Sequence, residues 1–420
     1  MAAGVMAGMV ELVRCAPDAV QAPVLDAAQG AAVSSPAATR LVLGAPGTGK
    51  SLLAVEAVVD AVDAGVPSDS CVILSPTRVR AGALRERASA RLANTSSAPM
   101  ARTPQALGFG ILRRVAAVEG REAPRLLTGP EQDVILRDLL AGHASGEVPG
   151  PRWPDFVHEA LATRGFRHEL RDLLMRAVEW GVDADHLRLL GEEHERQEWI
   201  AAAHVLDEYD QVTALSRPGA YDPAWIMGGA ADLLEAMPDQ LEQLHREFAL
   251  IVVDDAQELT RAAARLVSLL AGPTTRLMLI GDPDVAVQTF RGADPRLFLD
   301  LAERAGSPAR FELGTAHRSP RTIREAAARV TARIGSVAGG EHRSPSAAAR
   351  EGSVEVAMLR AVSQESAHIA AELRRAHLEG SVPWSQMAVI TRGQARISAL
   401  RRVLQSAGAG GDAADGHRAA

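Results

Sequence analysis

Short apolar runs and stretches with helical spacing alternate along the N-terminal part of the chain. The runs at 40–43 (RLVL) and 71–75 (CVILS) are typical of short buried strands. A helix is predicted after each run, one over 51–64, where Gly65 ends it, and one over 78–92, which is rich in arginine. Because strands alternate with helices, the pattern predicts a parallel sheet with crossover helices.

The pattern changes to helices only between about 103 and 247, with a proline–glycine break at 148–151. Strand signals return at 249–253 and 277–280, so a helical insertion is predicted inside one α/β domain. A second α/β unit is expected from about residue 311. Its predicted strands are 354–359 and 387–391, and its predicted helices are 321–334, 364–377 and 395–405.

The patterns also give expected domain bounds, within an α/β fold class. The bounds are 1–38 for an N-terminal segment, 39–102 and 248–305 for the first core, 103–247 for the helical insertion, 306–408 for part of a second core, and 409–420 for a tail. The tail is small and polar, so it is expected to be disordered.

Composition narrows the class of protein. The net charge is −7, so contact with nucleic acid would depend on local arginine patches. Cys15 and Cys71 show no metal-ligand spacing and no disulfide framework, and the twelve histidines are scattered, so no His/Cys metal site is predicted. The start lacks a signal peptide and no apolar run reaches the length of a membrane span, so a cytoplasmic protein without a membrane partner is expected.

Lys50 is the only lysine in the chain, and every other basic residue except histidine is arginine. It lies in a glycine-rich segment made up of Gly44, Ala45, Pro46, Gly47, Thr48, Gly49, Lys50 and Ser51, between a predicted strand and a predicted helix. Backbone N–H groups of such a loop surround phosphates, and a compact ammonium fits beside the β and γ oxygens where a forked guanidinium does not. The hydroxyl of Ser51 is placed to hold Mg²⁺. The segment therefore predicts binding of a nucleoside triphosphate.

The apolar run that ends in Asp254 and Asp255 predicts the second half of this nucleotide site. A carboxylate at the end of a buried strand orders the Mg²⁺ shell, and an adjacent carboxylate can orient and deprotonate the attacking water. Many strands end in Asp, so the pattern gains its weight from the presence of Lys50. The predicted helical insertion accounts for the long separation between Lys50 and Asp254.

Several segments, taken in order, resemble the motifs of superfamily 1 helicases of the UvrD/Rep type. They are residue 29 and the segments 44–51, 75–78, 102–104, 253–257, 281–293 and 316–319. The segment 281–293 is the most specific, because few other P-loop proteins carry it. The resemblance covers roughly residues 24–406, and the segments 153–154, 164–181 and 221–222 look most like the actinobacterial AdnA type, a subunit of a heterodimeric helicase–nuclease.

The resemblance implies a P-loop NTPase with a RecA-like core, a helical insertion and part of a second RecA-like core, using ATP and Mg²⁺. Gln29 would hydrogen-bond adenine, and His317 would lie at the edge of the nucleotide, where the family usually has tyrosine. The implied metal ligands are Ser51 and Asp254. The implied catalytic residues are Lys50, Asp254, Asp255, Arg291 and Arg318, the two arginines coupling the γ-phosphate to movement between cores.

The resemblance also implies contacts with single-stranded or tailed DNA. The residues implied are Ser75, Thr77, Arg78, Thr103 and Phe290. Pro76, Pro104 and Gln288 stand where the family commonly has aromatic or other DNA-facing groups, so Phe290 alone remains to stack on a base. Stacking is worth ~1–3 kcal/mol per base, so a weakened grip on the strand is expected.

Two further departures affect the expected activity. Asp255 is one methylene shorter than the usual glutamate, and Val285 replaces a glutamine that would contact the γ-phosphate. The late arginine motif, the large insertion of the second core and a nuclease domain do not occur in these 420 residues. The chain is therefore expected to be a truncated form that hydrolyses ATP slowly and unwinds no duplex by itself.

Three functions remain open at this point. The first is a DNA-dependent ATPase, the motor part of a helicase in DNA repair or recombination. The second is a non-catalytic, ATP-gated DNA-binding subunit that acts with a second helicase–nuclease subunit; Asp255 and Val285 favour it. The third is an unrelated P-loop enzyme, against which the segments 281–293 and 317–319 argue.

Overall fold

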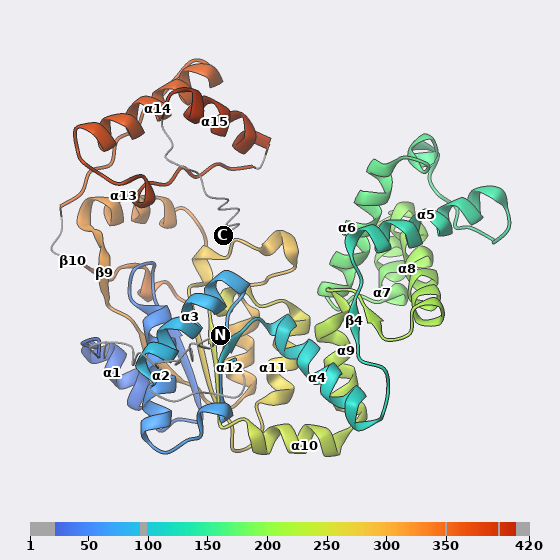
Figure 1. The fold of residues 1–420 in the computed structure, drawn as a ribbon, viewed down its shortest axis with the longest axis horizontal. Coiled ribbons are helices and arrows are strands. Elements are labelled where there is room, and N and C mark those ends of the chain that lie inside the picture. The colour runs from blue at the N-terminus through green and yellow to red at the C-terminus, as the bar shows by residue number, and fades with distance from the viewer. Residues whose placement is uncertain (1–21, 93–98, 349–350, 394, 409–420) are drawn as a thin grey trace, which may run out of the picture. The chain divides into compact units, whose positions relative to one another are not determined.

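The computed structural model describes residues 22–92, 99–348, 351–393 and 395–408. The chain forms two compact units, Met1–Gly352 and Ser353–Ala420 (Figure 1). None of the helices in the described ranges is both long enough and apolar enough to cross a membrane.

A six-stranded sheet organises the first unit. Its strand order is β3-β2-β6-β7-β1-β8, and every neighbouring pair is parallel. The strands are β1 (Thr39–Leu43), β2 (Cys71–Leu74), β3 (Ala101–Arg102), β6 (Leu250–Asp254), β7 (Arg276–Gly281) and β8 (Ala309–Glu312). All residues of β1, β2 and β6 are buried, which explains their continuous apolar runs. The predicted fold class and the four predicted strands of the first core are confirmed.

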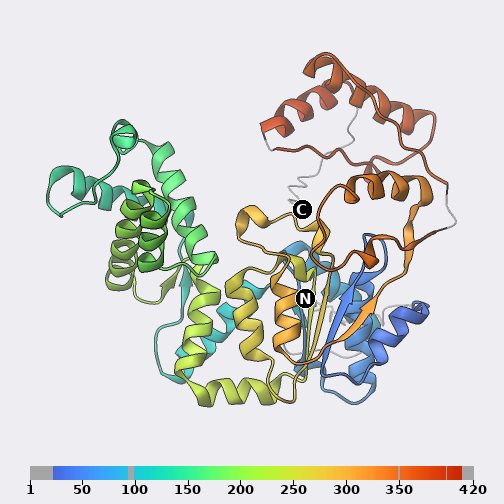
Figure 2. The ribbon, with the colours of Figure 1, turned by 180° about the vertical axis from the view of Figure 1, so that it is seen from behind.

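Alternate residues of each strand face two separate apolar cores. Leu41 and Ile251 belong to one core, whereas Val42 and Val252 belong to the other. The helices α1 (Ala27–Ser34), α2 (Lys50–Asp63) and α3 (Arg78–Arg91) cover the second of these faces. The helices α11 (Arg261–Leu270) and α12 (Leu297–Arg304) cover the first. The result is a three-layered sandwich, with the blue helices on one flank of the sheet and the yellow ones on the other (Figures 1 and 2).

The predicted helical insertion divides into two groups by its packing. Three helices pack on the sheet: α4 (Pro104–Val118), α9 (Trp225–Ala236) and α10 (Pro238–Glu247). Four others share a core of their own: α5 (Gly129–Ser145), α6 (Arg164–Glu179), α7 (Ala184–Glu193) and α8 (Gln197–Ser216). This second group, with the paired two-residue strands β4 (Arg125–Leu126) and β5 (Ala220–Tyr221), is called the helical lobe below (Figure 1).

The chain beyond the helix α12 differs from the expected second core. The strand β8 pairs with β1 of the first sheet, although residues 306–312 were assigned to the second core. The strands β9 (Thr315–Pro320) and β10 (Ser346–Ala348) form a separate parallel pair, and α13 (Arg321–Thr331) lies between them in sequence. Cys71, buried in β2, is a free thiol whose pKa is raised by burial to about 11, whereas Cys15 lies outside the described residues.

The second unit contains α14 (Val362–Leu378) and α15 (Ala395–Ser406), close to the helices predicted at 364–377 and 395–405. The predicted strands at 354–359 and 387–391 are not formed, since neither segment has ladder partners within the described ranges. Met358 and Ile390 are 94% and 95% exposed. An apolar run becomes a strand only when a partner covers its edge and face, and these two segments have none among the described residues.

Short 3₁₀ turns complete the described structure. They are η1 (Ser68–Ser70), η2 (Asp155–Ala160), η3 (Ala256–Glu258), η4 (Pro283–Val285), η5 (Thr289–Arg291), η6 (Glu341–Arg343) and η7 (Trp384–Gln386). Three of them, η3, η4 and η5, follow the strands β6 and β7 at the carboxyl edge of the sheet. Ligands of open parallel sheets bind outside this edge.

Candidate nucleotide site

The glycine-rich loop joins the strand β1 to the helix α2 at the carboxyl edge of the sheet. Gly47 and Gly49 have φ angles of 88° and 87°, a left-handed conformation that glycine adopts without strain. A Cβ atom on Gly49 would lie 2.5 Å from Nε2 of Gln29. The first turn of α2 therefore presents its free N–H groups over the loop, a ready site for a phosphate.

Lys50 directs its ammonium back into this loop. Its Nζ donates hydrogen bonds to the carbonyl oxygens of Gly44 and Ala45, at 2.6 and 3.1 Å. Burial lowers the pKa of Lys50, and the nearby carboxylates of Asp282 and Asp254 oppose that shift. A partly desolvated ammonium gains more from an anionic partner than an exposed one does, which suits contact with β- and γ-phosphates.

Asp254 and Ser51, the predicted metal ligands, lie together. Asp254 ends the strand β6 and is 1% exposed; burial raises its pKa, and a hydrogen bond from the Ser51 hydroxyl opposes the shift. Among the described residues its Oδ1 atom has no hydrogen-bond partner. A buried carboxylate oxygen without a partner is costly, and a carboxylate beside a hydroxyl is an oxygen donor set of the kind that Mg²⁺ takes. These residues therefore fit the metal.

Asp255, the predicted general base, has a φ of 53°, a conformation uncommon for a residue with a side chain. Its carboxylate forms an ion pair with Arg80 of the helix α3 and accepts a hydrogen bond from Gln257 at 3.3 Å. Gln257 is itself buried and accepts a hydrogen bond from the backbone N–H of Asp282 at 3.0 Å. Arg78 in this helix was predicted from the sequence but Arg80 was not, because a run of arginines does not show which one turns toward the site.

Gln29, the predicted adenine contact, fastens the loop. Its Nε2 donates to the carbonyl of Thr48 at 3.0 Å, while its Oε1 accepts from the N–H of Asp26 at 3.0 Å in the capping box of α1. His317 lies beside it, with its Nε2 3.4 Å from Gln29 Nε2 and 3.2 Å from an oxygen of Asp26. The implied adenine contact stays a prediction, since both ends of the Gln29 amide already have partners.

Residues of the strand β9 lie against the glycine-rich loop. The backbone N–H of His317 donates to the carbonyl of Gly47 at 2.9 Å, and a Cβ on Gly47 would lie 3.3 Å from Oγ of Ser319. Arg318, between these two residues, is exposed and contributes to the electrostatic environment of Lys50. The predicted pair His317 and Arg318 is thus brought to the phosphate loop.

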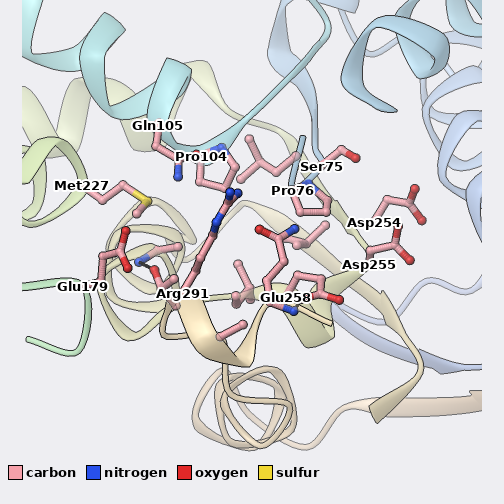
Figure 3. A pocket seen from close by; sticks show the side chains of 17 residues that line it. Ser75, Pro76, Pro104, Gln105, Glu179, Met227, Asp254, Asp255, Glu258 and Arg291 are labelled. Atoms are coloured by element: carbon pink, nitrogen blue, oxygen red, sulfur yellow. Dashed lines mark hydrogen bonds between the residues drawn. The ribbon is translucent and has the colours of Figure 1, made fainter. Parts of the chain in front are cut away.

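Arg291 is placed elsewhere, in a cavity of ≈ 250 Å³ beside the acidic end of β6. Figure 3 shows Arg291 in the middle of the cavity, with Glu179 and Met227 on one side and the two aspartates on the other. Its guanidinium carbon is 5.3 Å from the ring centre of Phe290. The wall of this cavity includes Ser75, Pro76, Pro104, Glu179, Asp254 and Asp255.

Glu179 comes from the helical lobe and was not identified from the sequence. Burial raises the pKa of Glu179, while Arg176 and Arg291 oppose the shift. The neighbouring Trp180 lies against the turn that follows Arg291, since a Cβ on Gly292 would be 3.3 Å from its ring. The end of the helix α6 therefore packs on the turn that holds Arg291, and only the folded chain shows this contact.

The predicted DNA contacts lie along the same edge but differ in their exposure and hydrogen bonding. Thr77 and Thr103 cap the helices α3 and α4, and their hydroxyl oxygens accept hydrogen bonds from backbone N–H groups at 3.2 and 3.1 Å. Ser75 is buried in the cavity wall, and its hydroxyl has no hydrogen-bond partner in the described part of the chain. Arg78 and Phe290 are exposed. Arg78, at the capped start of α3, and the ring of Phe290 therefore face the surface, whereas Thr103 and Pro104 at the start of α4 are buried.

A buried ionic cluster behind the loop was also missed by the sequence analysis. Asp284 pairs with Arg343, and Nε2 of His342 lies 3.4 Å from Asp282 and 3.2 Å from Asp284. The side chains of His342 and Asp282 are 0% and 3% exposed. These contacts join the turn after β7 to residues about sixty positions later, so no local pattern predicts them.

Comparison with known proteins identifies a helicase family. Residues 25–306 match the UvrD/REP helicase N-terminal domain. The ATP-dependent DNA helicase UvrD2 of Mycobacterium tuberculosis is 26% identical over 418 residues, which cover 91% of this chain and 54% of that protein. The ATP-dependent DNA helicase PcrA of Staphylococcus epidermidis is 27% identical over 194 residues, 45% of this chain and 26% of that protein. The chain thus spans about half the length of UvrD2 and a smaller share of PcrA.

Proposed function

The chain belongs to the UvrD/REP helicase family, and on that premise we propose that it is the ATP-binding, single-strand-binding part of a DNA helicase. The observation that carries the proposal is the buried Asp254, which accepts a hydrogen bond from Ser51 at the start of the helix α2 and interacts electrostatically with Lys50. The proposed reaction is hydrolysis of ATP to ADP and phosphate, coupled to movement along single-stranded or tailed DNA.

Each group of the site has a proposed part in the reaction. Lys50 and the N–H groups of the loop hold the β- and γ-phosphates, and Ser51 and Asp254 hold Mg²⁺, which would neutralise charge between those phosphates. Asp255 orients the attacking water and accepts its proton, for which its carboxylate has to leave the ion pair with Arg80. The site therefore needs a change at Arg80 before water can be activated.

Movement would be coupled to the nucleotide through the two arginines. A hydrogen bond from the backbone of His317 to Gly47 holds His317 and Arg318 beside the glycine-rich loop. A γ-phosphate bound in the loop would therefore lie next to the strand β9. Arg291 lies in the cavity beside Asp254 and Asp255, next to Phe290. A change at the acidic end of β6 would therefore alter the surface proposed to grip a base.

The proposed DNA surface is the edge formed by the starts of α3 and α4 and the turn at Phe290. N–H groups at helix N-termini and the side chain of Arg78 would take phosphates without reading sequence. We further propose membership of the AdnA type, acting in double-strand-break repair with a second helicase–nuclease subunit. This finer proposal rests on the resemblance of the segments 153–154, 164–181 and 221–222.

A second candidate function is a non-catalytic subunit that binds DNA under the control of ATP. The ion pair between Asp255 and Arg80 favours it, because a carboxylate held by a guanidinium is a poor base. Val285, which stands where the family has a glutamine, offers the γ-phosphate no hydrogen bond.

Single-turnover hydrolysis of ATP, with and without single-stranded DNA, tests both functions. The motor function predicts turnover that DNA stimulates and that Lys50→Ala removes. The non-catalytic function predicts no turnover but a DNA affinity that changes when ATP binds. A chain that binds neither ATP nor single-stranded DNA would rule out both.

A further inference from the structure

Two histidines and a glutamate of the helical lobe come together far from the nucleotide site. His143 lies near the end of the helix α5, and His204 and Glu208 lie one turn apart on α8. His143 Nε2 is 2.7 Å from Oε2 of Glu208, and His204 Nε2 is 3.3 Å from Oε1 of the same carboxylate. One potential ligand atom from each of the three side chains lies within 4.8 Å of the others.

The burial of His143 makes this arrangement unusual. Its side chain is 8% exposed, and within the described ranges neither ring nitrogen has a hydrogen-bond partner. Oε2 of Glu208 is equally buried and without a hydrogen bond, so the 2.7 Å approach lacks the direction of one. Buried polar atoms in folded proteins are normally satisfied, and atoms that converge without bonding each other point to a shared third partner.

We propose that His143, His204 and Glu208 bind a divalent transition-metal ion of the Zn²⁺ class, which links α5 to α8. Two imidazoles and one carboxylate are the donor set that such ions take, whereas Mg²⁺ and Ca²⁺ take oxygen ligands alone. Neutral imidazole and ionised carboxylate are the forms of these side chains that bind such an ion.

The spacing of the three side chains is compatible with this ion. Tetrahedral zinc, with bonds of about 2.0–2.2 Å, places its ligand atoms roughly 3.3–3.6 Å apart. The 3.3 Å separation between His204 and Glu208 matches this spacing, whereas the 2.7 Å separation between His143 and Glu208 has to widen when the ion binds. The His204 side chain is 46% exposed, so it has room to turn toward the ion.

The helices α5 and α8 fix the positions of the metal ligands because they share a buried core. Leu136 and Leu140 of α5 and Leu206 of α8 belong to the same buried core of the helical lobe. The loop that follows α5 packs closely on His143 at Gly150. A Cβ atom on Gly150 would lie 2.7 Å from the Cβ atom of His143. Ligands on packed helices keep their geometry better than ligands on loops.

Three protein ligands leave one tetrahedral position for water or another group. His204 also lines a cavity of ≈ 670 Å³, whose wall includes the carboxylates of Asp207 and Asp210. The carboxylate of Asp207 attracts cations, whereas burial raises the pKa of Asp210 to about 7, so Asp210 carries only part of a negative charge at neutral pH. The open position of the metal is therefore expected on the cavity side, and the metal adds stability to the lobe because it binds only the folded form.

Local sequence patterns do not reveal this site, because 61 positions separate the two histidines. A His–carboxylate pair at helical spacing is by itself common: His168 and Asp172 form one on α6, and His368 and Glu372 another on α14. The group at His143 differs in having a third ligand on a neighbouring helix and a buried, unbonded ring.

The test measures binding of zinc alone to the full chain, stripped of metal by a chelator and kept in excess Mg²⁺ to fill the nucleotide site. Titration calorimetry should show a single ion per chain, and Co²⁺ in its place should give the strong visible absorption of a four-coordinate site. His143→Gln, His204→Gln and Glu208→Gln should each weaken binding at least about tenfold. His168→Gln, which removes another histidine–carboxylate pair of the lobe, should leave binding unchanged.

Zinc should also raise the thermal midpoint of the wild-type chain but not that of His204→Gln. Because His204 is half exposed, its replacement leaves the core intact, which retained ATP binding and an unchanged circular dichroism spectrum would confirm. No binding by the wild-type chain would overturn the proposal and leave an ion pair only. Equal binding by the wild type and all three variants would also overturn it, because the ion would then lie elsewhere.

Discussion

Arg343 holds Asp284 with two hydrogen bonds, from Nη2 to Oδ1 at 2.5 Å and from Nε to Oδ2 at 2.6 Å. The same guanidinium donates to the carbonyl of Gly335 at 2.8 Å and to that of Thr331, the last residue of the helix α13, at 3.2 Å. Asp284 is the middle residue of the turn η4, which follows β7, and α13 follows the strand β9, which carries Arg318. Arg343 therefore ties the turn after β7 to the helix that follows the Arg318 strand, two segments from different parts of the chain.

Loss of this tie should destabilise the first unit. Arg343→Ala leaves Asp284, whose side chain is 5% exposed, without its charged partner. Breaking a buried pair from one side costs roughly 3 kcal/mol, so the urea midpoint should fall accordingly, and Arg343→Lys should recover only part because lysine cannot make two parallel bonds. Arg321→Ala, which removes an exposed pair with Glu325, is the control and should change stability by less than about 0.5 kcal/mol.

The sequence could predict the strands and helices that depend on local patterns of residues. The strand β1 was predictable because Leu41, Val42 and Leu43 are continuous and buried on both faces. The segments 354–359 and 387–391 have the same local pattern, but a strand also needs a partner, and a single run of residues contains no information about its partner. The helix spans were predicted closely for the same reason that β1 was.

The candidate site likewise combines residues that the sequence predicts with contacts that depend on the folded chain. The loop around Lys50 and the carboxylate of Asp254 follow from residue type and spacing, since phosphate and metal binding demand those groups in order. The contacts of Arg80, Glu179 and Arg343 depend on which of many charged side chains point inward after packing. An arginine-rich composition makes that choice invisible in the sequence, because most arginines cover the surface.

Lys50 should be indispensable for nucleotide binding, and arginine should not replace it. Lys50→Ala removes the ammonium that the carbonyls of Gly44 and Ala45 hold in the loop. Titration with a fluorescent ATP analogue should show at least a tenfold loss of affinity, about 1.4 kcal/mol. Lys50→Arg should show a similar loss because its fork does not fit, whereas Arg78→Ala should bind ATP normally. Unchanged affinity in Lys50→Ala would refute the nucleotide site.

Asp254 should cost the nucleotide-free chain stability at neutral pH. Burial raises the pKa of Asp254, so the folded state binds a proton more tightly than the unfolded state does. The stability is therefore highest below the unfolded pKa of 3.8 and is lost as the pH rises through the folded value. Asp254→Asn should raise the thermal midpoint at pH 7, and the gain should shrink as the pH is lowered.

The same substitution should abolish Mg²⁺-dependent binding of ATP, which separates its two effects. Asp239→Asn, at an exposed position on α10, is the control, and its midpoint should stay close to that of the wild type at both pH values. A lower midpoint for Asp254→Asn at pH 7 would show that the carboxylate is satisfied in the free chain, against the orphaned oxygen described above.

Single-stranded DNA should bind with strong salt dependence and little sequence preference, despite the net charge of −7. Arg78 and the helix N-termini would contact phosphates, so Arg78→Glu should weaken binding and flatten its salt dependence. Phe290, 57% exposed, should supply stacking, and Phe290→Ala should cost ~1–3 kcal/mol. Phe156→Ala, which removes a 76% exposed ring in the helical lobe, is the matched control. A binding curve that is flat with salt would contradict the proposed surface.

Hydrolysis by this chain should be slow, and its rate should depend on the reach of one carboxylate. Asp255 is a methylene shorter than the glutamate usual at this position and is held by Arg80, so water activation is doubly impaired. Asp255→Glu should raise the single-turnover rate, Asp255→Asn should lower it to background, and Arg80→Gln should raise it only if the ion pair is the obstacle. None of these changes should alter ATP affinity beyond about twofold, because Lys50, Ser51 and Asp254 hold the nucleotide. If Asp255→Glu binds ATP normally and still shows no DNA-stimulated turnover, the motor function is wrong for this chain, and the ATP-gated binding subunit remains.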